Sequence, residues 1–265
     1  MSIAILKTHR REKLFTERPP YHWGGIIQKN LPHSDLLDEA EWQELLGHTR
    51  ILYAEKRFEG CDGLELTDEM KITVSAWGAL LLLGRKTDYY PLLQSILIYP
   101  SAFIVPVKKI VADGVALEQT EVRSGESHGT AGPGTLILAW DEVLRSAEDY
   151  SDGVNVALHE FAHQLDLEDQ TLNGTPLLEN EELRERWKNI CAREFDHLVA
   201  QVEAGRDDML IDPYGSTSPA EFFSVITEHF FEWPRDLRGE HPELYAVLRD
   251  YYKQDPAQRW DAAEG

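Results

Sequence analysis

Apolar residues recur at helical spacing over much of this chain. Where an apolar position returns every three to four residues beside a polar face, the pattern predicts an amphipathic helix packed on a core. Residues 1–33 lack this pattern and are rich in proline and aromatic residues, so we expect an irregular N-terminal arm laid on the body. The predicted helices cover residues 34–47, 51–58, 67–83, 180–204 and the segment after Pro242.

Two short apolar runs predict strands instead. Residues 95–100 and 135–140 are shorter than a typical helix and rich in Ile and Leu, as buried strands are. Because the chain has no internal repeat and no clear linker, we expect one α+β domain over residues 1–265. Its parts are the arm, a helical part over 34–94, and a catalytic part over 95–265. Shorter strands are expected at residues 103–105, 115–117 and 120–122.

The next helical segment carries a His-Glu-x-x-His pattern and is predicted to begin at Asp152, a good N-cap. His159 and His163 lie four residues apart, so both imidazoles can face one metal ion. Glu160 can then accept a proton from a water molecule at that metal. The alternative is a core helix with two incidental histidines and a solvated glutamate. Two histidines at this spacing with Glu between them favour a zinc site.

A catalytic zinc site needs a third protein ligand. In one known arrangement, a glycine three residues after the second histidine leads to a ligand three residues further on. Here these positions hold Asp166 and Asp169, so the sharp turn is missing and Asp169 is a poor candidate. Asp166 is better suited to orient an imidazole or to tie down the end of the helix.

Stronger candidates lie in residues 212–228. Ser218 is a predicted N-cap and Pro219 a first helical residue, and the helix that follows carries Glu221 and Glu228 on one face. Glu221 could bind the metal, or merely complete a capping box with Ser218. Glu228 could bind, support a ligand or be solvated. The spacing leaves these alternatives open.

The strand at 135–140 precedes the histidine helix. If one of its edges is free, it can pair with an extended peptide through main-chain hydrogen bonds and so hold a substrate near the metal. An ordinary core strand fits the same residues equally well.

The composition of the chain argues against some classes of binding partner. A net charge of −21 and a pI near 4.8 argue against nucleic acid, whose phosphates require clustered Lys and Arg. Cys61 and Cys191 form neither a disulfide framework nor a cysteine zinc site, and they suit a reducing cytoplasm. The basic N-terminus is not followed by an apolar run, and the apolar stretch 76–83 is too short to span a bilayer. We therefore expect a cytoplasmic protein with no membrane partner.

Two segments read His-Glu-Phe-Ala-His-Gln-Leu-Asp from residue 159 and Asp-Pro-Tyr-Gly-Ser-Thr-Ser-Pro-Ala-Glu-Phe-Phe from residue 212. Together they resemble the Mlc titration factor A (MtfA) family of bacterial zinc metallopeptidases. The resemblance extends over nearly the whole chain, and the C-terminal half is also similar to the catalytic domain of anthrax lethal factor. It implies a mainly helical, zincin-like metallopeptidase fold of the gluzincin type, with a small β-sheet beside the zinc helix.

The resemblance also implies roles for individual residues. One Zn²⁺ per chain would be held by His159, His163 and Glu221, with Glu160 as general base and Glu228 supporting a ligand. Tyr214 matches the position of a tyrosine thought to stabilise the oxyanion, although a packed turn tyrosine would look the same in sequence.

Two functions follow from these expectations. The first is a zinc-dependent metallopeptidase, aminopeptidase-like on short peptides. The second is a regulatory protein that sequesters an Mlc-like transcriptional repressor without hydrolysing it, the property from which the family takes its name. The intact Glu160 favours the enzyme, since a pure binding protein needs no base beside a metal.

Overall fold

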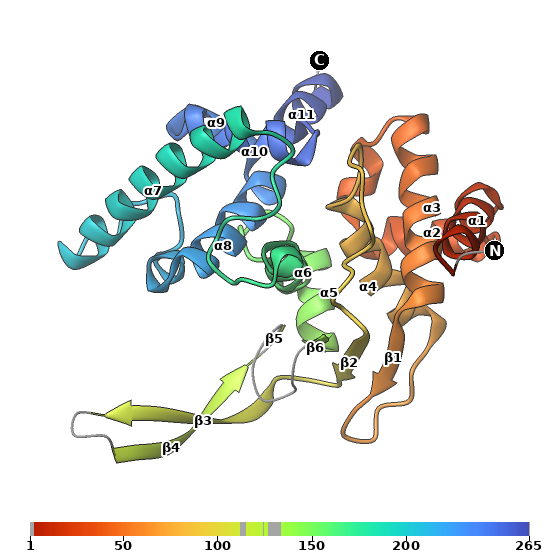
Figure 1. Cartoon of the computed structure of the whole chain (residues 1–265), viewed down its shortest axis with the longest axis horizontal. Coiled ribbons are helices and arrows are strands. Elements are labelled where there is room, and N and C mark those ends of the chain that lie inside the picture. Colours follow the sequence, from red (N-terminus) through yellow and green to blue (C-terminus); the bar gives the residue numbers. More distant parts are fainter. Residues whose placement is uncertain (1–2, 112–114, 124, 127–133, 265) are drawn as a thin grey trace.

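The N-terminal helices pack together at one side of the molecule (Figure 1). The computed structural model describes the chain except for residues 1–2, 112–114, 124, 127–133 and 265. The N-terminal elements are α1 (Ile3–Thr16), α2 (His22–Asn30), the short 3₁₀ helix η1 (Pro32–Leu36), α3 (Glu39–Glu55) and α4 (Asp68–Leu80).

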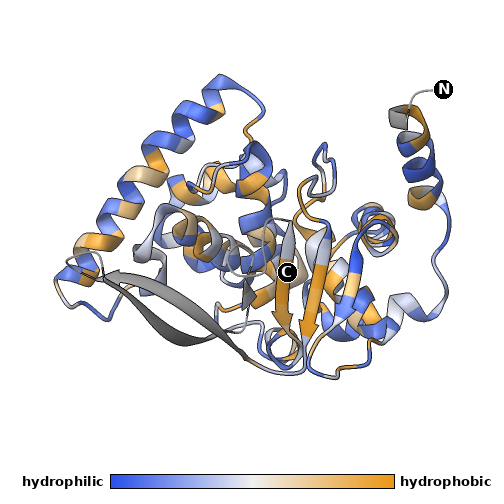
Figure 2. Cartoon of the chain, turned by 60° about the horizontal axis from the view of Figure 1, so that its bottom comes forward, coloured by the Kyte–Doolittle hydropathy of each residue, from blue (hydrophilic) through white to orange (hydrophobic). Residues whose placement is uncertain are grey.

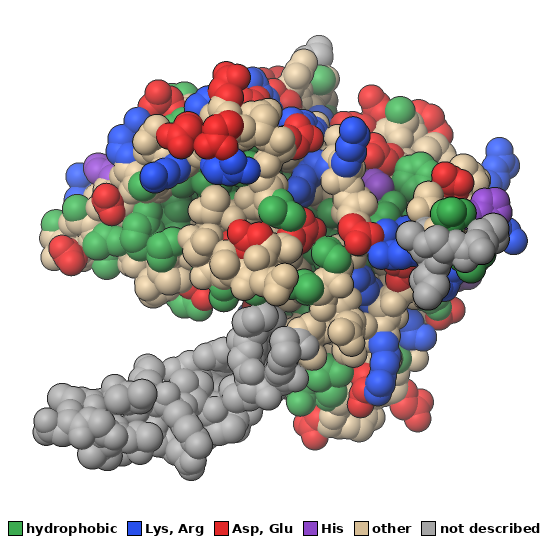
Figure 3. Space-filling view, viewed as in Figure 1, with side chains coloured by type: hydrophobic (Ala, Val, Ile, Leu, Met, Phe, Trp, Pro, Cys, Tyr) green, Lys and Arg blue, Asp and Glu red, His purple; other side chains and the backbone are tan. Residues whose placement is uncertain are grey.

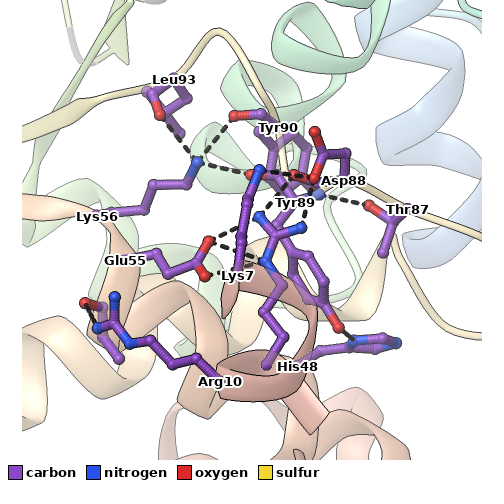
Figure 4. A network of polar contacts seen from close by, with 12 residues as sticks. Lys7, Arg10, His48, Glu55, Lys56, Thr87, Asp88, Tyr89, Tyr90 and Leu93 are labelled. Carbon is purple, nitrogen blue, oxygen red and sulfur yellow. Dashed lines mark hydrogen bonds and ion pairs between the residues drawn. The ribbon is translucent and has the colours of Figure 1, made fainter. Parts of the chain in front are cut away.

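The prediction of an irregular arm over residues 1–33 is wrong, because most of this segment is helical. Ion pairs join α1 to the body. Arg11 lies 2.7 Å from Glu55. Lys7 lies 2.9 Å from Asp88 (Figure 4). These partners are more than 40 positions away in the chain, so the local pattern of apolar residues carries no trace of them.

Helix α3 runs through two segments predicted as separate helices, residues 34–47 and 51–58. Gly47 does not interrupt it. A Cβ there would lie 2.6 Å from the ring of Phe15, so the glycine allows α1 to pack closely on α3. Strand β1 (Arg57–Gly60) then occupies the last positions of the predicted second helix.

Lys56, between α3 and β1, holds the turn that leads into the sheet. Its ammonium donates hydrogen bonds to the carbonyls of Tyr89, Tyr90 and Leu93 at 2.6, 2.8 and 2.8 Å (Figure 4). Tyr89 and Tyr90 have φ values of 60° and 53°, a conformation that costs energy for residues other than glycine. The three hydrogen bonds therefore stabilise a strained turn at the entrance of β2.

A small sheet lies beneath the central helices (Figure 1). Its order is β1-β2-β6-β5, with β2 (Ser95–Tyr99) parallel to both β1 and β6 (Thr135–Ala139), and β5 (Gly125–Glu126) antiparallel to β6. The central strands are strongly apolar (Figure 2). Both strands predicted from the apolar runs are confirmed, as is a mainly helical fold with a small sheet.

Between β2 and β5, the chain forms an antiparallel hairpin of β3 (Phe103–Val111) and β4 (Val115–Arg123). It projects from the body in Figure 1. The two short strands predicted at 115–117 and 120–122 are parts of one continuous strand, β4. Residues 127–133, in the glycine-rich segment before β6, lie outside the described residues.

The remaining helices form the other side of the molecule, with α6 and α8 packed on each other. Acidic side chains are spread over both helical groups (Figure 3), which fits a role in solubility better than a single acidic binding face. Among the described residues, no helix combines the length and apolar character needed to cross a bilayer. These elements are α5 (Trp140–Glu148), α6 (Val156–Asp166), η2 (Leu167–Asp169), α7 (Glu181–Glu203), η3 (Pro213–Thr217), α8 (Pro219–Glu232), α9 (Pro234–Glu240), α10 (Pro242–Tyr252) and α11 (Pro256–Glu264).

His33 and Glu232 meet in the interior where η1 approaches α8. Their closest N···O distance is 3.8 Å, yet they are not an ion pair at neutral pH. Burial lowers the pKa of His33 to about 4 and raises the pKa of Glu232 well above its usual value. Both side chains are therefore neutral, as expected for groups removed from water.

This buried histidine predicts a pH-dependent stability. The unfolded state binds a proton at His33 below about pH 6.5, whereas the folded state does so only near pH 4. The contribution of His33 to the free energy of unfolding therefore falls with decreasing pH in this window, by up to about 1.4 kcal/mol per pH unit, whereas Glu232, with its raised pKa, contributes in the opposite direction. His33→Leu removes the first contribution, so acidification should destabilise this variant less than the native protein. Urea unfolding at a series of pH values measures it, and identical slopes for both proteins would contradict the assignment.

Candidate metal centre

Helix α6 begins later than predicted from Asp152. The Asp152 carboxylate instead accepts a hydrogen bond from the Val154 amide at 2.9 Å, and Gly153 has a φ of 79°, which is incompatible with an α-helix. Asn155 is the actual N-cap, and its side-chain oxygen accepts a hydrogen bond from the Leu158 amide at 3.0 Å.

His159 and His163 project from α6 side by side, with ring centroids 4.9 Å apart. Glu221, from the first turn of α8, reaches both rings. Its Oε2 lies 2.9 Å from Nε2 of His159 and 3.3 Å from Nε2 of His163. The possible ligand atoms of these three residues lie within 4.8 Å of one another, and no other such group of three occurs in the part of the chain that the structure describes.

These residues fit a metal ion. Two imidazole nitrogens and one carboxylate oxygen are the protein ligands of many catalytic zinc sites, which leave a fourth position open. Burial raises the pKa of Glu221, but hydrogen bonds from His159 and His163 outweigh this effect and lower the pKa far below its usual value. The carboxylate is therefore ionised at neutral pH, as a metal ligand must be.

Glu228 lies behind the cluster, two turns further along α8. Its Oε1 is 2.7 Å from Nδ1 of His159, and its Oε2 accepts a hydrogen bond from the Asn155 amide at 2.6 Å. The contact with Nδ1 turns the opposite nitrogen of the ring towards Glu221, as carboxylates commonly do for metal-binding histidines. Of the two glutamates that the sequence left open, Glu221 faces both imidazoles and Glu228 supports one.

The capping-box alternative for Glu221 applies only to its backbone. Ser218 caps α8 by accepting a hydrogen bond from the Glu221 amide at 3.2 Å. The Glu221 carboxylate instead contacts the two histidines. The cap therefore fixes the first turn of α8 and leaves the carboxylate available as a ligand.

Tyr214 lies beside His159, whereas Asp166 is the last residue of α6. The ring centroid of Tyr214, on η3, is 5.9 Å from that of His159, and 53% of the residue is exposed. Asp166 accepts hydrogen bonds from the amides of Gly174 and Thr175 at 2.7 and 2.9 Å. Of the two roles considered for Asp166, these contacts correspond to tying down the helix end.

Asp169 takes no part in the cluster. Its carboxylate accepts hydrogen bonds from the amide and hydroxyl of Thr171 at 2.8 and 2.6 Å, within a local turn. This agrees with the low expectation drawn from the missing glycine.

Residues 6–253 match the sequence model of the glucose-regulated metallo-peptidase M90 family. The chain belongs to this family. It is similar to an uncharacterised protein of Synechocystis sp., with 41% identity over 249 residues, 93% of this chain and 89% of that protein. It is also similar to proteins named Mlc titration factor A from Yersinia pestis and Yersinia pseudotuberculosis, each with 30% identity over 237 residues, 88% of this chain and 86% of theirs. The resemblance to the MtfA family is confirmed.

Two further residues shape the site of this M90 protein and were missed in the sequence. Asn155 caps α6 and also donates to Glu232 at 2.9 Å, so it joins the histidine helix to α8. An Asn before an apolar helical run is an N-cap signal, but Asp152, three residues earlier, is an equally good N-cap by residue type. Gly125 of β5 lies against Glu160, where a Cβ would be 2.5 Å from the carboxylate oxygen. Nothing in the local sequence distinguishes Gly125 from the other glycines between residues 113 and 134.

Strand β5 is the edge strand of the sheet next to β6. Gly125 and Glu126 pair with Leu138 and Ile137 of β6, opposite the edge of β6 that pairs with β2. The hypothesis of a free edge at β6 is therefore wrong at these two positions. The reason is tertiary, since the pairing partner follows a hairpin whose return to the sheet cannot be read from local alternation.

Proposed function

We propose that this chain is a zinc-dependent peptidase with a gluzincin-type site. In it, His159, His163 and Glu221 hold the ion and Glu160 is the general base. The observation that carries the proposal is the convergence of three ligand atoms within 4.8 Å, beside a glutamate that follows the first ligand directly. Membership of a metallopeptidase family supports the same reaction class.

The chemistry divides between the ion and the side chains. A zinc ion held by this cluster supplies Lewis acidity, which polarises a peptide carbonyl and makes water more acidic. Glu160 takes the proton of the attacking water and delivers it to the leaving amine. Glu160 is 6% exposed. Its burial would strengthen the attraction between its carboxylate and a zinc ion held by the cluster. Glu228 keeps the His159 ring oriented through the whole cycle.

Tyr214 is proposed to donate a hydrogen bond to the oxyanion that develops on the scissile carbonyl. Its ring beside His159 and the 53% exposure of the residue support this role. We expect Tyr214→Phe to lower kcat on the order of 10²-fold with little change in KM, since the hydrogen bond forms mainly in the transition state. Steady-state kinetics measure this, and an unchanged kcat would assign the tyrosine to packing alone.

The proposed substrates are short peptides with a free N-terminus, as the MtfA resemblance implies. The first test is hydrolysis of chromogenic amino-acid amides by the zinc-loaded protein. We expect a chelator to abolish this activity and added zinc to restore it. Cleavage of internal bonds in N-terminally blocked peptides, with no action on the amides, would replace the aminopeptidase proposal by an endopeptidase.

A second candidate function is the sequestration of an Mlc-like transcriptional repressor. The names of the Yersinia relatives support it. Binding of such a repressor should survive Glu160→Gln, because this function uses the surface rather than the base. Co-purification of a repressor with the variant tests this, and a requirement for Glu160 would contradict independence from hydrolysis.

A further inference from the structure

A cavity of about 320 Å³ opens beside the metal cluster. It lies between α5, the turn before α6, and α8, and both His159 and Tyr214 contribute to its lining. Of the three cluster residues only His159 lines it, so a peptide whose scissile carbonyl sits at the cluster reaches the cavity with a side chain that extends past His159 and Tyr214. The volume of the cavity is at the lower end of the range for small-molecule sites and is sufficient for one large side chain.

The walls of the cavity are largely apolar. Val154, Val156 and Val225 come from the turn, from α6 and from α8, so three separate elements present branched aliphatic groups to one space. Val225 is 3% exposed and belongs to the core, whereas Val154 is 53% exposed. An apolar ligand side chain that covers the exposed Val154 removes apolar surface from water, and this burial contributes to the free energy of binding.

The charged groups around the cavity are mostly paired already. Arg145 of α5 lies 2.9 Å from Glu142. The two oxygens of Glu228 are occupied by His159 and Asn155. With Asp212, three acidic residues and one arginine line the cavity, so this part of its wall disfavours an additional negative charge.

We propose that this cavity is the specificity subsite for one residue flanking the scissile bond, and that it takes an apolar side chain of the size of leucine or phenylalanine. The apolar walls provide affinity, and the carboxylates exclude aspartate and glutamate. The inference rests on the proposed peptidase function and deepens it, since it names the substrate class. Val154 is the residue through which this preference can be changed without disturbing the core.

The test uses short peptides in which the two residues flanking the scissile bond are varied one at a time among Gly, Leu, Phe, Lys and Glu. For the native zinc-loaded protein, we expect kcat/KM at one of the two positions to rise from Gly to Leu and Phe, and to be lowest for Glu. In Val154→Asp, the Leu and Phe peptides should lose about tenfold or more, while the Gly peptide changes little. In Val154→Trp, the Phe peptide should lose most, because the cavity is filled.

The matched control is Ile5→Asp. It places the same charge at a residue that is 56% exposed on α1, outside this cavity. Its preferences should equal those of the native protein. Zinc content and circular dichroism establish that each variant is folded and loaded.

A second measurement does not depend on turnover. Binding of the same peptides to zinc-loaded Glu160→Gln, by calorimetry, should show the same order of side chains, and the additional Val154→Asp change should abolish it. Equal preferences with and without the Val154 changes would overturn the subsite. Absence of hydrolysis by the native protein, with apolar-selective binding retained, would overturn the peptidase proposal and leave the cavity as a binding site.

Discussion

Glu160→Gln is expected to lower peptide hydrolysis on the order of 10³-fold or more while the protein keeps its metal. The amide is nearly the same size as the carboxylate but cannot accept the proton of the attacking water, and general-base catalysis contributes roughly 10²–10⁴-fold. Glu160 does not belong to the three residues whose ligand atoms converge, so metal affinity should be almost unchanged. Single-turnover kinetics and metal analysis of the purified variant measure the two quantities separately.

Two results would contradict this assignment in different ways. Hydrolysis at the native rate would remove Glu160 from the mechanism. Loss of zinc would make it a ligand or a support of the metal cluster. Gln164, which is also buried on α6 but is not among the three converging residues, provides a matched control when replaced by glutamate.

Glu221→Ala is expected to weaken zinc binding on the order of 10³-fold, since it removes one of three protein ligands. Glu228→Gln should weaken it less, by roughly 10–100-fold, because it disturbs only the orientation of His159. The difference follows from geometry: Glu221 contacts Nε2 of both histidines, whereas Glu228 contacts Nδ1 of one. Competition with a chromophoric chelator measures both affinities.

The order of these two effects is the decisive outcome. A larger loss of zinc affinity for Glu228→Gln than for Glu221→Ala would exchange the roles of the two glutamates. Thermal unfolding of the metal-free proteins serves as the control, because Glu228 also binds the Asn155 amide and its replacement can lower stability without zinc.

Much of the site was accessible from sequence because it depends on local periodicity. The i, i+4 spacing of His159 and His163 determines that both rings share a face of any helix, and α6 is helical for the apolar pattern that surrounds them. Ser218 and Pro219 likewise predict the start of α8 correctly, since capping is a local interaction. The two central strands follow from short apolar runs for the same reason.

Features that depend on distant partners were not accessible in this way. Helix α1 is held by Glu55 and Asp88, Gly47 stays in α3 because Phe15 packs against it, and Gly125 returns from the hairpin to lie on Glu160. In each case, the deciding contact joins residues well separated in the chain, and no periodicity within either segment encodes it.

The sequence by itself determined that two histidines and a glutamate would stand together on one helix, and that a second helix would offer two further glutamates on one face. Only the tertiary structure decided between those glutamates. The angle and distance at which α8 packs on α6 bring Glu221 to both imidazoles and leave Glu228 behind one of them. That packing results from burial of nearly all of α8 beyond its first turn, a property of the assembled chain rather than of either helix.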